Sequence, residues 1–221
     1  MEGLSVRLLL MESSNVPNCL GNSSCLSIPI VVRFQMKAWI KVVEESEAKE
    51  ELAKVYDKVR GSRGRVSNVM KAHSLDPEAM KLHLELYLHL IYGKSSLTRI
   101  QREMIAVLVS QLNGCRYCVT HHKEALQSHA RNPDLIKSLE EDLSNAPISK
   151  RDRTMLEYVA KLTRQPSLVA ETDVRRMREE GFTDEELLRV NLITSYFNFV
   201  NRVVAGLGIT LEETSDRVYN Y

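Results

Sequence analysis

Helix-start signals recur along this chain, and they constrain its fold more than any other feature. Asp76-Pro77 and Asn132-Pro133 each place a capping side chain before a proline, which is favoured at the first position of a helix. Thr183 is followed three residues later by Glu186, which completes a capping-box pattern. Apolar side chains at helical spacing follow each signal. The sequence therefore predicts a succession of helices.

The segment from Leu82 to Leu90 is the one place where the pattern is ambiguous. Leucine alternates there with histidine, glutamate and tyrosine, a period of two that is typical of a strand. The cap at Asp76, the distance to Gly93 and the strong helix formers favour a helix that is apolar on several sides. Such helices are buried, often against a second subunit. We interpret His83 and His89 as hydrogen-bonded polar positions, because a spacing of six puts them on different faces.

Elsewhere the helical period is plain. One stripe of apolar side chains has the spacing i, i+3, i+4, i+7, and Gly61 is expected to end that helix; the stripe consists of Leu52, Val55, Tyr56 and Val59. The sequence Gly61-Ser-Arg-Gly-Arg65 is read as a connecting loop in preference to an anion cradle. Because no strand run, internal repeat or glycine-rich phosphate loop occurs, we predict an all-α fold of about eight helices.

The residues that carry chemistry lie in the stretch Gly114–His122. Cys115 and Cys118 are three apart, about one helical turn, so their sulfurs can bond to each other or hold one metal ion. His122 is four residues beyond Cys118 and shares its face, where the imidazole can take the thiol proton. Asn113-Gly114 ends one helical pattern, which places Cys115 in the first turn of the next helix. The unpaired N–H groups there favour a thiolate.

Helical arithmetic adds Glu103 to this stretch. If residues 99–112 and 114–128 form two antiparallel helices, Glu103 lies nine residues before the turn and His122 eight after it. At about 1.5 Å per residue, their side chains lie at nearly the same height. We therefore expect the carboxylate to orient the imidazole and to stabilise its charged form.

The pattern of Glu103, an eleven-residue gap and Cys115-x-Tyr117-Cys118-x-x-x-His122 resembles the active-site pattern of AhpD-like alkylhydroperoxidases. These belong to the carboxymuconolactone decarboxylase superfamily, and the wider similarity, from about Met36 to about Glu213, is to its peroxidase-related branch. The resemblance implies an AhpD-like helical domain, a homo-oligomer, a hydroperoxide substrate and an unidentified thiol or dithiol reductant. It implies no haem, flavin or metal cofactor. Decarboxylation is disfavoured, because that chemistry needs no Cys-x-x-Cys pair.

Two opposing arguments decide which cysteine attacks. The helix terminus favours a thiolate at Cys115, an effect of about 0.3–1 kcal/mol. His122 is closer to Cys118, and a neighbouring cation lowers a pKa by roughly one to three units. We therefore predict that Cys118 attacks and Cys115 closes the disulfide, which agrees with the family resemblance.

Two other readings of the cysteine pair remain open. The cysteines can be small buried thiols in a structural interaction module, or they can bind zinc together with a histidine. Zinc needs a fourth ligand, and no second Cys-x-x-Cys or paired-histidine cluster offers one. Redox chemistry needs no further ligand: a thiolate attacks an oxidant, and the second thiol resolves the sulfenic acid as a disulfide.

The neighbours of the motif are given supporting roles. Some family members carry a histidine where this chain has Tyr117, and tyrosine, with a normal pKa near 10, shuttles protons less readily near neutral pH. Packing and a catalytic role are equally open for Tyr117. We interpret His121 as a solvent-side neighbour of the base. Asn201 and Arg202 serve either a subunit contact or an internal network.

Composition limits the partners of the protein. The chain has 30 basic and 29 acidic residues with no long basic run, which argues against nucleic acid. No apolar run approaches the roughly 20 residues needed to span a bilayer, so no membrane is expected. A Cys-x-x-Cys pair in a cysteine-poor chain indicates reactive thiols in a reducing, cytoplasmic environment.

The first 35 residues differ from the rest in composition. They mix serine and asparagine with short apolar pieces and lack helical periodicity, and their cysteines, Cys19 and Cys25, are read as incidental. We expect residues 1–35 to be an N-terminal appendage, loosely ordered or added by an over-extended gene prediction. Residues 36–221 are expected to form the helical domain.

Overall fold

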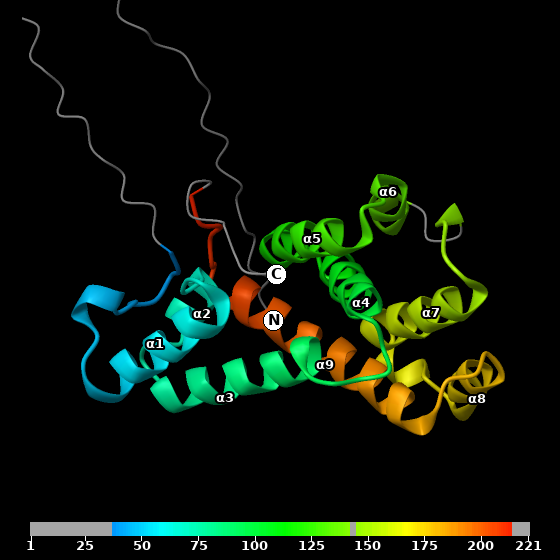
Figure 1. Cartoon of the computed structure of the whole chain (residues 1–221), viewed down its shortest axis with the longest axis horizontal. Helices are drawn as coiled ribbons and strands as arrows, with labels where there is room; N and C mark the ends of the chain where they lie inside the picture. The colour runs from blue at the N-terminus through cyan, green and yellow to red at the C-terminus, as the bar shows by residue number, and fades with distance from the viewer. Residues whose placement is uncertain (1–36, 142–144, 214–221) are drawn as a thin grey trace, which may run out of the picture. The chain divides into compact units, whose positions relative to one another are not determined.

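The computed structural model describes residues 37–141 and 145–213, and these residues are all-α (Figure 1). The expectation for residues 1–35 lies outside the described part of the chain and stays a prediction. Within the described part no strand forms, and no helix is long and apolar enough to cross a membrane. The helices are α1 (Glu50–Arg63), α2 (Asn68–Lys71), α3 (Pro77–Tyr87), α4 (Arg99–Leu112), α5 (Arg116–Ala130), α6 (Pro133–Glu141), α7 (Lys150–Arg164), α8 (Glu171–Glu179) and α9 (Asp184–Gly206).

Helix α4 is the centre of the domain. Every residue from Gln101 to Ser110 is buried, and the helix contacts α5, α7 and α9 (Figure 1). A helix apolar on nearly all sides is stable only when other helices cover it, which is the arrangement found here. Arg102 is buried as well, and its guanidinium donates to the backbone carbonyls of Ile91, Gly93 and Leu97.

The predicted helix starts are confirmed. The Asp76 carboxylate accepts from the Ala79 N–H at 3.0 Å, and the Asn132 side chain accepts from two N–H groups in the first turn of α6. Thr183 and Glu186 form a reciprocal capping box at the start of α9. These contacts satisfy N–H groups that no intrahelical carbonyl can reach.

The ambiguous leucine segment is helical in two parts. Helix α3 continues into a five-residue π-helix, η2 (Leu88–Tyr92), which ends at Gly93. Leu84 and Leu90 are buried, whereas Leu82 and Leu86 remain exposed. The π-helix has more residues per turn than an α-helix, so its leucines point in other directions than an α-helix would give them. The alternating leucines therefore lie in a helix that is buried on one side.

The predicted end of α1 was wrong by three residues. The helix continues past Gly61 to Arg63, and Gly64 ends it with a φ of 80°. A residue in this left-handed conformation commonly closes a helix, and glycine adopts it without a steric penalty. Arg63 therefore belongs to the last turn of α1. Of the segment from Gly61 to Arg65, which we predicted to be a loop, only Gly64 and Arg65 lie in the connection between α1 and α2.

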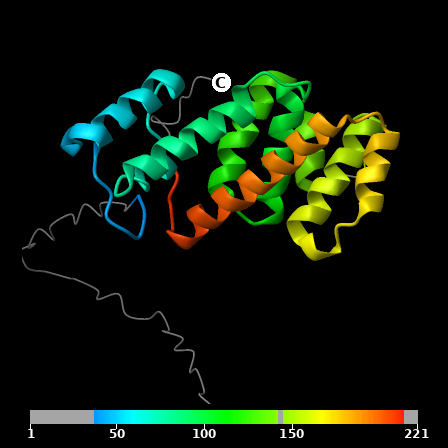
Figure 2. The ribbon, with the colours of Figure 1, turned by 90° about the horizontal axis from the view of Figure 1, so that it is seen from below.

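Helices α3 and α9 run in the same diagonal direction in Figure 2. A 2.8 Å hydrogen bond joins His83 of α3 to Tyr196 of α9, and Arg189 of α9 donates to the His89 carbonyl in η2. Helix α9 also contacts α4 and α7. Most of the functional side chains described below come from α1, α3, α4, α5 and α9.

Because α4 is enclosed on all sides, removing side-chain volume from it should be costly. Ile105→Ala is expected to lower the free energy of unfolding by about 2–5 kcal/mol, since the cavity left behind cannot collapse fully. Leu168→Ala, at a side chain that is 57% exposed, should change it by less than about 0.5 kcal/mol. Urea denaturation of both variants measures the difference, and similar small losses would contradict the central position of α4.

Candidate active site

The two cysteines meet at the turn between α4 and α5. Gly114 takes a φ of 65° there, and the Cys115 N–H donates to the Ser110 carbonyl at 2.9 Å. Cys115 is the N-cap of α5, one position before the first turn in which we had placed it, and Cys118 lies inside that turn. Both are free, buried thiols, and their sulfurs lie 2.9 Å apart. The geometry permits the pair to share one proton.

The two thiols differ in acidity. The hydrogen bond from the Cys118 thiol lowers the pKa of Cys115, and this outweighs burial; the N–H groups of Cys118 and Tyr117 and the Asn201 amide lower it further. The same hydrogen bond, together with burial and the Cys115 charge, raises the pKa of Cys118 well above its usual value. The first proton lost from the pair therefore leaves the negative charge on Cys115.

This order of acidity is the reverse of the one that we expected for the two cysteines. We expected the charge of His122 to favour a thiolate at Cys118 more than the helix terminus favours one at Cys115. In the structure Cys115 caps the helix, while Cys118 is the more buried of the two and donates to its partner. Burial and the shared proton therefore outweigh the expected effect of the imidazole.

Glu103 and His122 lie at the same level, as the helical arithmetic predicted. Oε2 of Glu103 is 2.7 Å from Nδ1 of His122, and Oε1 accepts from Nε of Arg99 at 2.7 Å. Burial would raise the pKa of Glu103, but the charges and hydrogen bonds of His122 and Arg99 hold it below its usual value. The fully buried carboxylate is therefore ionised, and it fixes the orientation of the imidazole.

His121 was misplaced as a solvent-side neighbour. Its side chain is only 12% exposed, and its Nε2 lies 2.8 Å from Oε2 of Glu212. The other oxygen of Glu212 accepts from the Tyr117 hydroxyl at 2.7 Å and from the Asn68 N–H at 2.6 Å. Burial raises the pKa of Glu212, but His121, Asn68 and Tyr117 lower it to about 2. Tyr117 is thus packed and hydrogen-bonded, and a second carboxylate–histidine pair lies beside the first.

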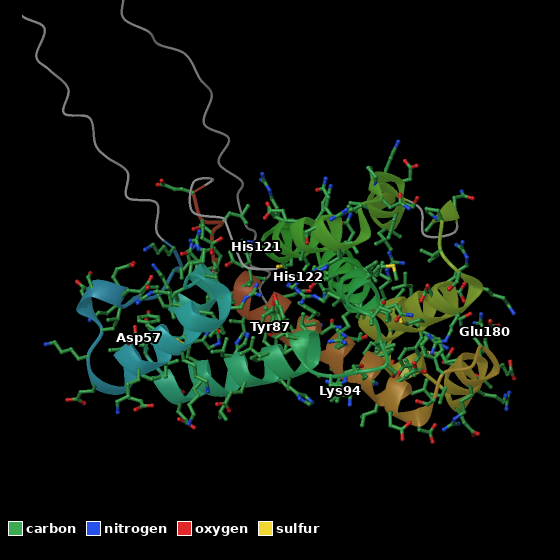
Figure 3. All side chains as sticks on the ribbon, viewed as in Figure 1. Asp57, Tyr87, Lys94, His121, His122 and Glu180 are labelled. Atoms are coloured by element: carbon green, nitrogen blue, oxygen red, sulfur yellow. The ribbon has the colours of Figure 1, made fainter. Side chains whose placement is uncertain are left out.

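A cavity lies in front of these groups. Cys118, His121 and His122 line it together with Tyr117. The ring centroids of His122 and Tyr87, both labelled in Figure 3, lie 6.4 Å apart. Cys115 is not part of its lining. The rest of the wall is mainly aliphatic and aromatic, and it includes Val59, Val69, Met70, Leu84, Tyr87, Tyr196, Phe197 and Val200. Of the two thiols, Cys118 is therefore the one that a small molecule in the cavity can reach.

Arg63 and Arg65 also line this cavity, and neither Glu103 nor Glu212 does. The guanidinium of Arg63 lies 5.1 Å from the centre of the Tyr87 ring and 5.0 Å from that of Tyr92. The glycine-and-arginine segment read as a plain connector therefore supplies positive charge to the cavity wall.

The sequence did not connect two further groups, Asn201 and Glu212, with the cysteine motif. Asn201 is buried, donates to the Ser110 hydroxyl at 3.2 Å, and accepts from Asn113 at 2.9 Å. Its amide also bears on the acidity of both cysteines, so the internal-network reading is the correct one for Asn201. No spacing rule connects Asn201 or Glu212 to the motif, because both lie far along the chain. Within the described residues no three histidine, cysteine, aspartate or glutamate side chains gather as a metal site.

Comparison with solved structures supports the fold. A peroxidase-related protein from Silicibacter sp. TM1040 has a TM-score of 0.74 and 29% identity, covering 82% of this chain and 95% of its own. An uncharacterized peroxidase-related protein with an alkylhydroperoxidase AhpD core, from Ralstonia eutropha JMP134, has a TM-score of 0.73 and 27% identity, covering 80% and 94%. The debrominase Bmp8 shares the fold at 16% identity, with a TM-score of 0.67 and coverage of 80% and 92%.

The resemblance inferred from the cysteine motif is thus confirmed at the level of the AhpD-like superfamily. A family model matches residues 33–220, which is most of the chain. By that match, the protein belongs to the PA26 p53-induced protein (sestrin) family.

Proposed function

We propose that this protein is a thiol-dependent peroxidase that reduces hydroperoxides through a dithiol–disulfide cycle of Cys118 and Cys115. One observation carries the proposal. Cys118, 2.9 Å from its partner sulfur, lines a cavity together with His122, whose ring is held by the buried carboxylate of Glu103. The AhpD-like, peroxidase-related neighbours support the choice of a hydroperoxide as substrate.

The mechanism begins with one proton leaving the thiol pair for His122, directly or through water. The proton that remains moves to Cys115, so that Cys118 is the thiolate facing the cavity. Cys118 attacks the terminal oxygen of the hydroperoxide, the O–O bond breaks, and the leaving oxygen takes the proton from His122. The Cys115 thiol then displaces water from the sulfenic acid and closes the disulfide. A thiol or dithiol reductant restores the pair.

The acidity order of the cysteines is compatible with this sequence. The charge rests on Cys115, at the helix N-terminus, until an oxidant occupies the cavity. A proton shift across 2.9 Å then moves the charge to Cys118. Coupled groups of this kind titrate as a pair, so the pKa of one sulfur alone does not determine which sulfur attacks.

The protein is also proposed to be a homo-oligomer. Large apolar side chains form an exposed stripe on α9, namely Leu188, Leu192 and Phe199, and a second stripe on α3, namely Leu82 and Leu86. The ring centroids of Phe199 and His83, which is next to Leu82 on α3, lie 5.8 Å apart, so α3 and α9 pack together near these side chains. Exposed apolar side chains on neighbouring helices typically mark a protein interface, and a second copy of the chain offers the same surface.

The roles of the cysteines are tested by sulfenic acid trapping and mass spectrometry after stoichiometric hydroperoxide. Cys115→Ser should form a trappable sulfenic acid at Cys118, because the attacking sulfur keeps its place in the cavity wall. Cys118→Ser should be inert at the same concentrations. The reverse pattern would make Cys115 the nucleophile. Reactivity in neither variant, with zinc found by metal analysis, would favour the metal-binding or structural module.

Glu103→Gln should retain the fold and slow peroxide reduction by about tenfold to a hundredfold, less than the roughly 10²–10⁴-fold expected for loss of the proton-transfer group itself. Without the carboxylate, the imidazole loses the partner that fixes its orientation. Single-turnover rates with a hydroperoxide measure the change.

The matched control for that variant is Glu186→Gln. Glu186 is also buried and ion-paired, with Arg151 at 2.6 Å, but it does not line the cavity. Glu186→Gln should leave the rate of peroxide reduction unchanged. If Glu103→Gln and His122→Ala both react at the wild-type rate, the proposed relay is wrong.

The oligomer is tested by sedimentation velocity over a range of concentrations. Leu86→Glu and Leu192→Glu should each dissociate the assembly, because a charge would be buried in the interface. Leu168→Glu, at an exposed leucine outside the two stripes, should not. A wild-type protein that sediments as a monomer at all concentrations would refute the proposed assembly.

A further inference from the structure

A chain of hydrogen bonds connects the cavity wall to the turn after α2. The Tyr196 hydroxyl lies 2.8 Å from Nε2 of His83, and Nδ1 of His83 lies 3.2 Å from Nε2 of His73. Nδ1 of His73 lies 2.8 Å from the backbone carbonyl oxygen of Val69. The mechanism proposed above uses none of these groups.

The Val69 carbonyl determines where each proton of the chain lies. A carbonyl oxygen can only accept, so Nδ1 of His73 carries a hydrogen and, in the neutral ring, Nε2 does not. His83 must then donate from Nδ1 to His73, which leaves its own Nε2 without a hydrogen. The Tyr196 hydroxyl therefore donates to His83, and toward the cavity it offers only lone pairs.

The protonation states of the inner groups agree with this arrangement. Burial, with a smaller contribution from His73, lowers the pKa of His83 to about 3, so its ring is neutral at physiological pH. Burial, followed by Tyr87 and Cys118, raises the pKa of Tyr196 well above its usual value, so its hydroxyl keeps its proton. Tyr196 is thus a neutral group whose one hydrogen is already in use.

Tyr196 and His83 line the same cavity as Cys118 and His122. A hydroperoxide carries one O–H group, on the terminal oxygen that the thiolate attacks. We infer that Tyr196 binds this O–H as its hydrogen-bond acceptor, and that His83 and His73 are positioning residues that hold Tyr196 in the accepting state. The inference rests on the proposed peroxidase function and names a recognition element of that site.

The assignment is consistent with the atoms that move. The Cys118 thiolate forms a bond to the terminal oxygen, the O–O bond breaks, and its electron pair goes to the other oxygen, which takes a proton from His122. The terminal oxygen keeps its hydrogen throughout and becomes the sulfenic acid. An acceptor at Tyr196 can therefore hold that oxygen in line with the sulfur before and after the transfer.

The test compares two oxidants of Cys118 in single-turnover reactions of the full-length Cys115→Ser protein. Cumene hydroperoxide has the O–H group, whereas dithiodipyridine is a disulfide without one and reports thiolate reactivity alone. Adding Tyr196→Phe should slow the hydroperoxide reaction by about tenfold, the loss expected for one hydrogen bond, and leave the disulfide reaction unchanged. Circular dichroism verifies folding.

A second variant tests the polarity of the chain. His73→Leu removes the ring that accepts from Nδ1 of His83, so His83 is no longer held in the form that accepts from Tyr196. The ratio of the hydroperoxide rate to the disulfide rate should therefore fall. His89→Leu, at an exposed histidine outside the chain, should leave the ratio unchanged.

The outcomes separate this inference from the function on which it rests. Equal slowing of both reactions by Tyr196→Phe, or no slowing, would refute the role of Tyr196 while the peroxidase function stands. A ratio that His73→Leu leaves unchanged would refute the positioning role of the histidines. A protein that reacts with the disulfide but with no hydroperoxide would overturn the proposed function and this inference together.

Discussion

The ionised carboxylate of Glu103, in the centre of an apolar helix, is the constraint on which the site depends. A buried charge is tolerated only when other charges and hydrogen bonds compensate for the lost hydration. Arg99, one turn earlier on α4, and His122, on α5, provide that compensation at 2.7 Å each. Because the charge of Glu103 must be compensated by His122, α5 is held against α4 at the height and rotation that bring these two side chains together. The same ion pair therefore fixes the packing of α5 on α4 and the orientation of the imidazole.

The features that the sequence predicted well are local ones. Caps, helical stripes and the placement of Glu103 level with His122 follow from the regular rise and turn of a helix, so spacing alone revealed them. The features that the sequence did not predict depend on contacts between distant segments. Tyr117 and Glu212 are 95 residues apart and meet at 2.7 Å. No periodicity connects them, and the role of His121 was misread because its partner could not be identified.

The acidity of the cysteines shows the same limit. The sequence placed Cys115 at the helix terminus, where the structure has it, and it placed the two sulfurs about one turn apart. It could not show how deeply each sulfur is buried or which thiol would donate to the other. Burial depends on tertiary packing, and together with the direction of this hydrogen bond it reverses the expected order. A competition between several electrostatic contributions is decided only by their distances and burial.

The charges around the cavity have a consistent arrangement. Both carboxylates, Glu103 and Glu212, lie behind a histidine, while Arg63 and Arg65 belong to the cavity wall. In the proposed reaction, negative charge moves from the sulfur to the leaving oxygen as the O–O bond breaks. Positive charge in the cavity wall and a histidine that can donate its proton would both favour that movement. Neither carboxylate lines the cavity, and each contacts a histidine that does, so each anion would act on the proposed reaction through a histidine.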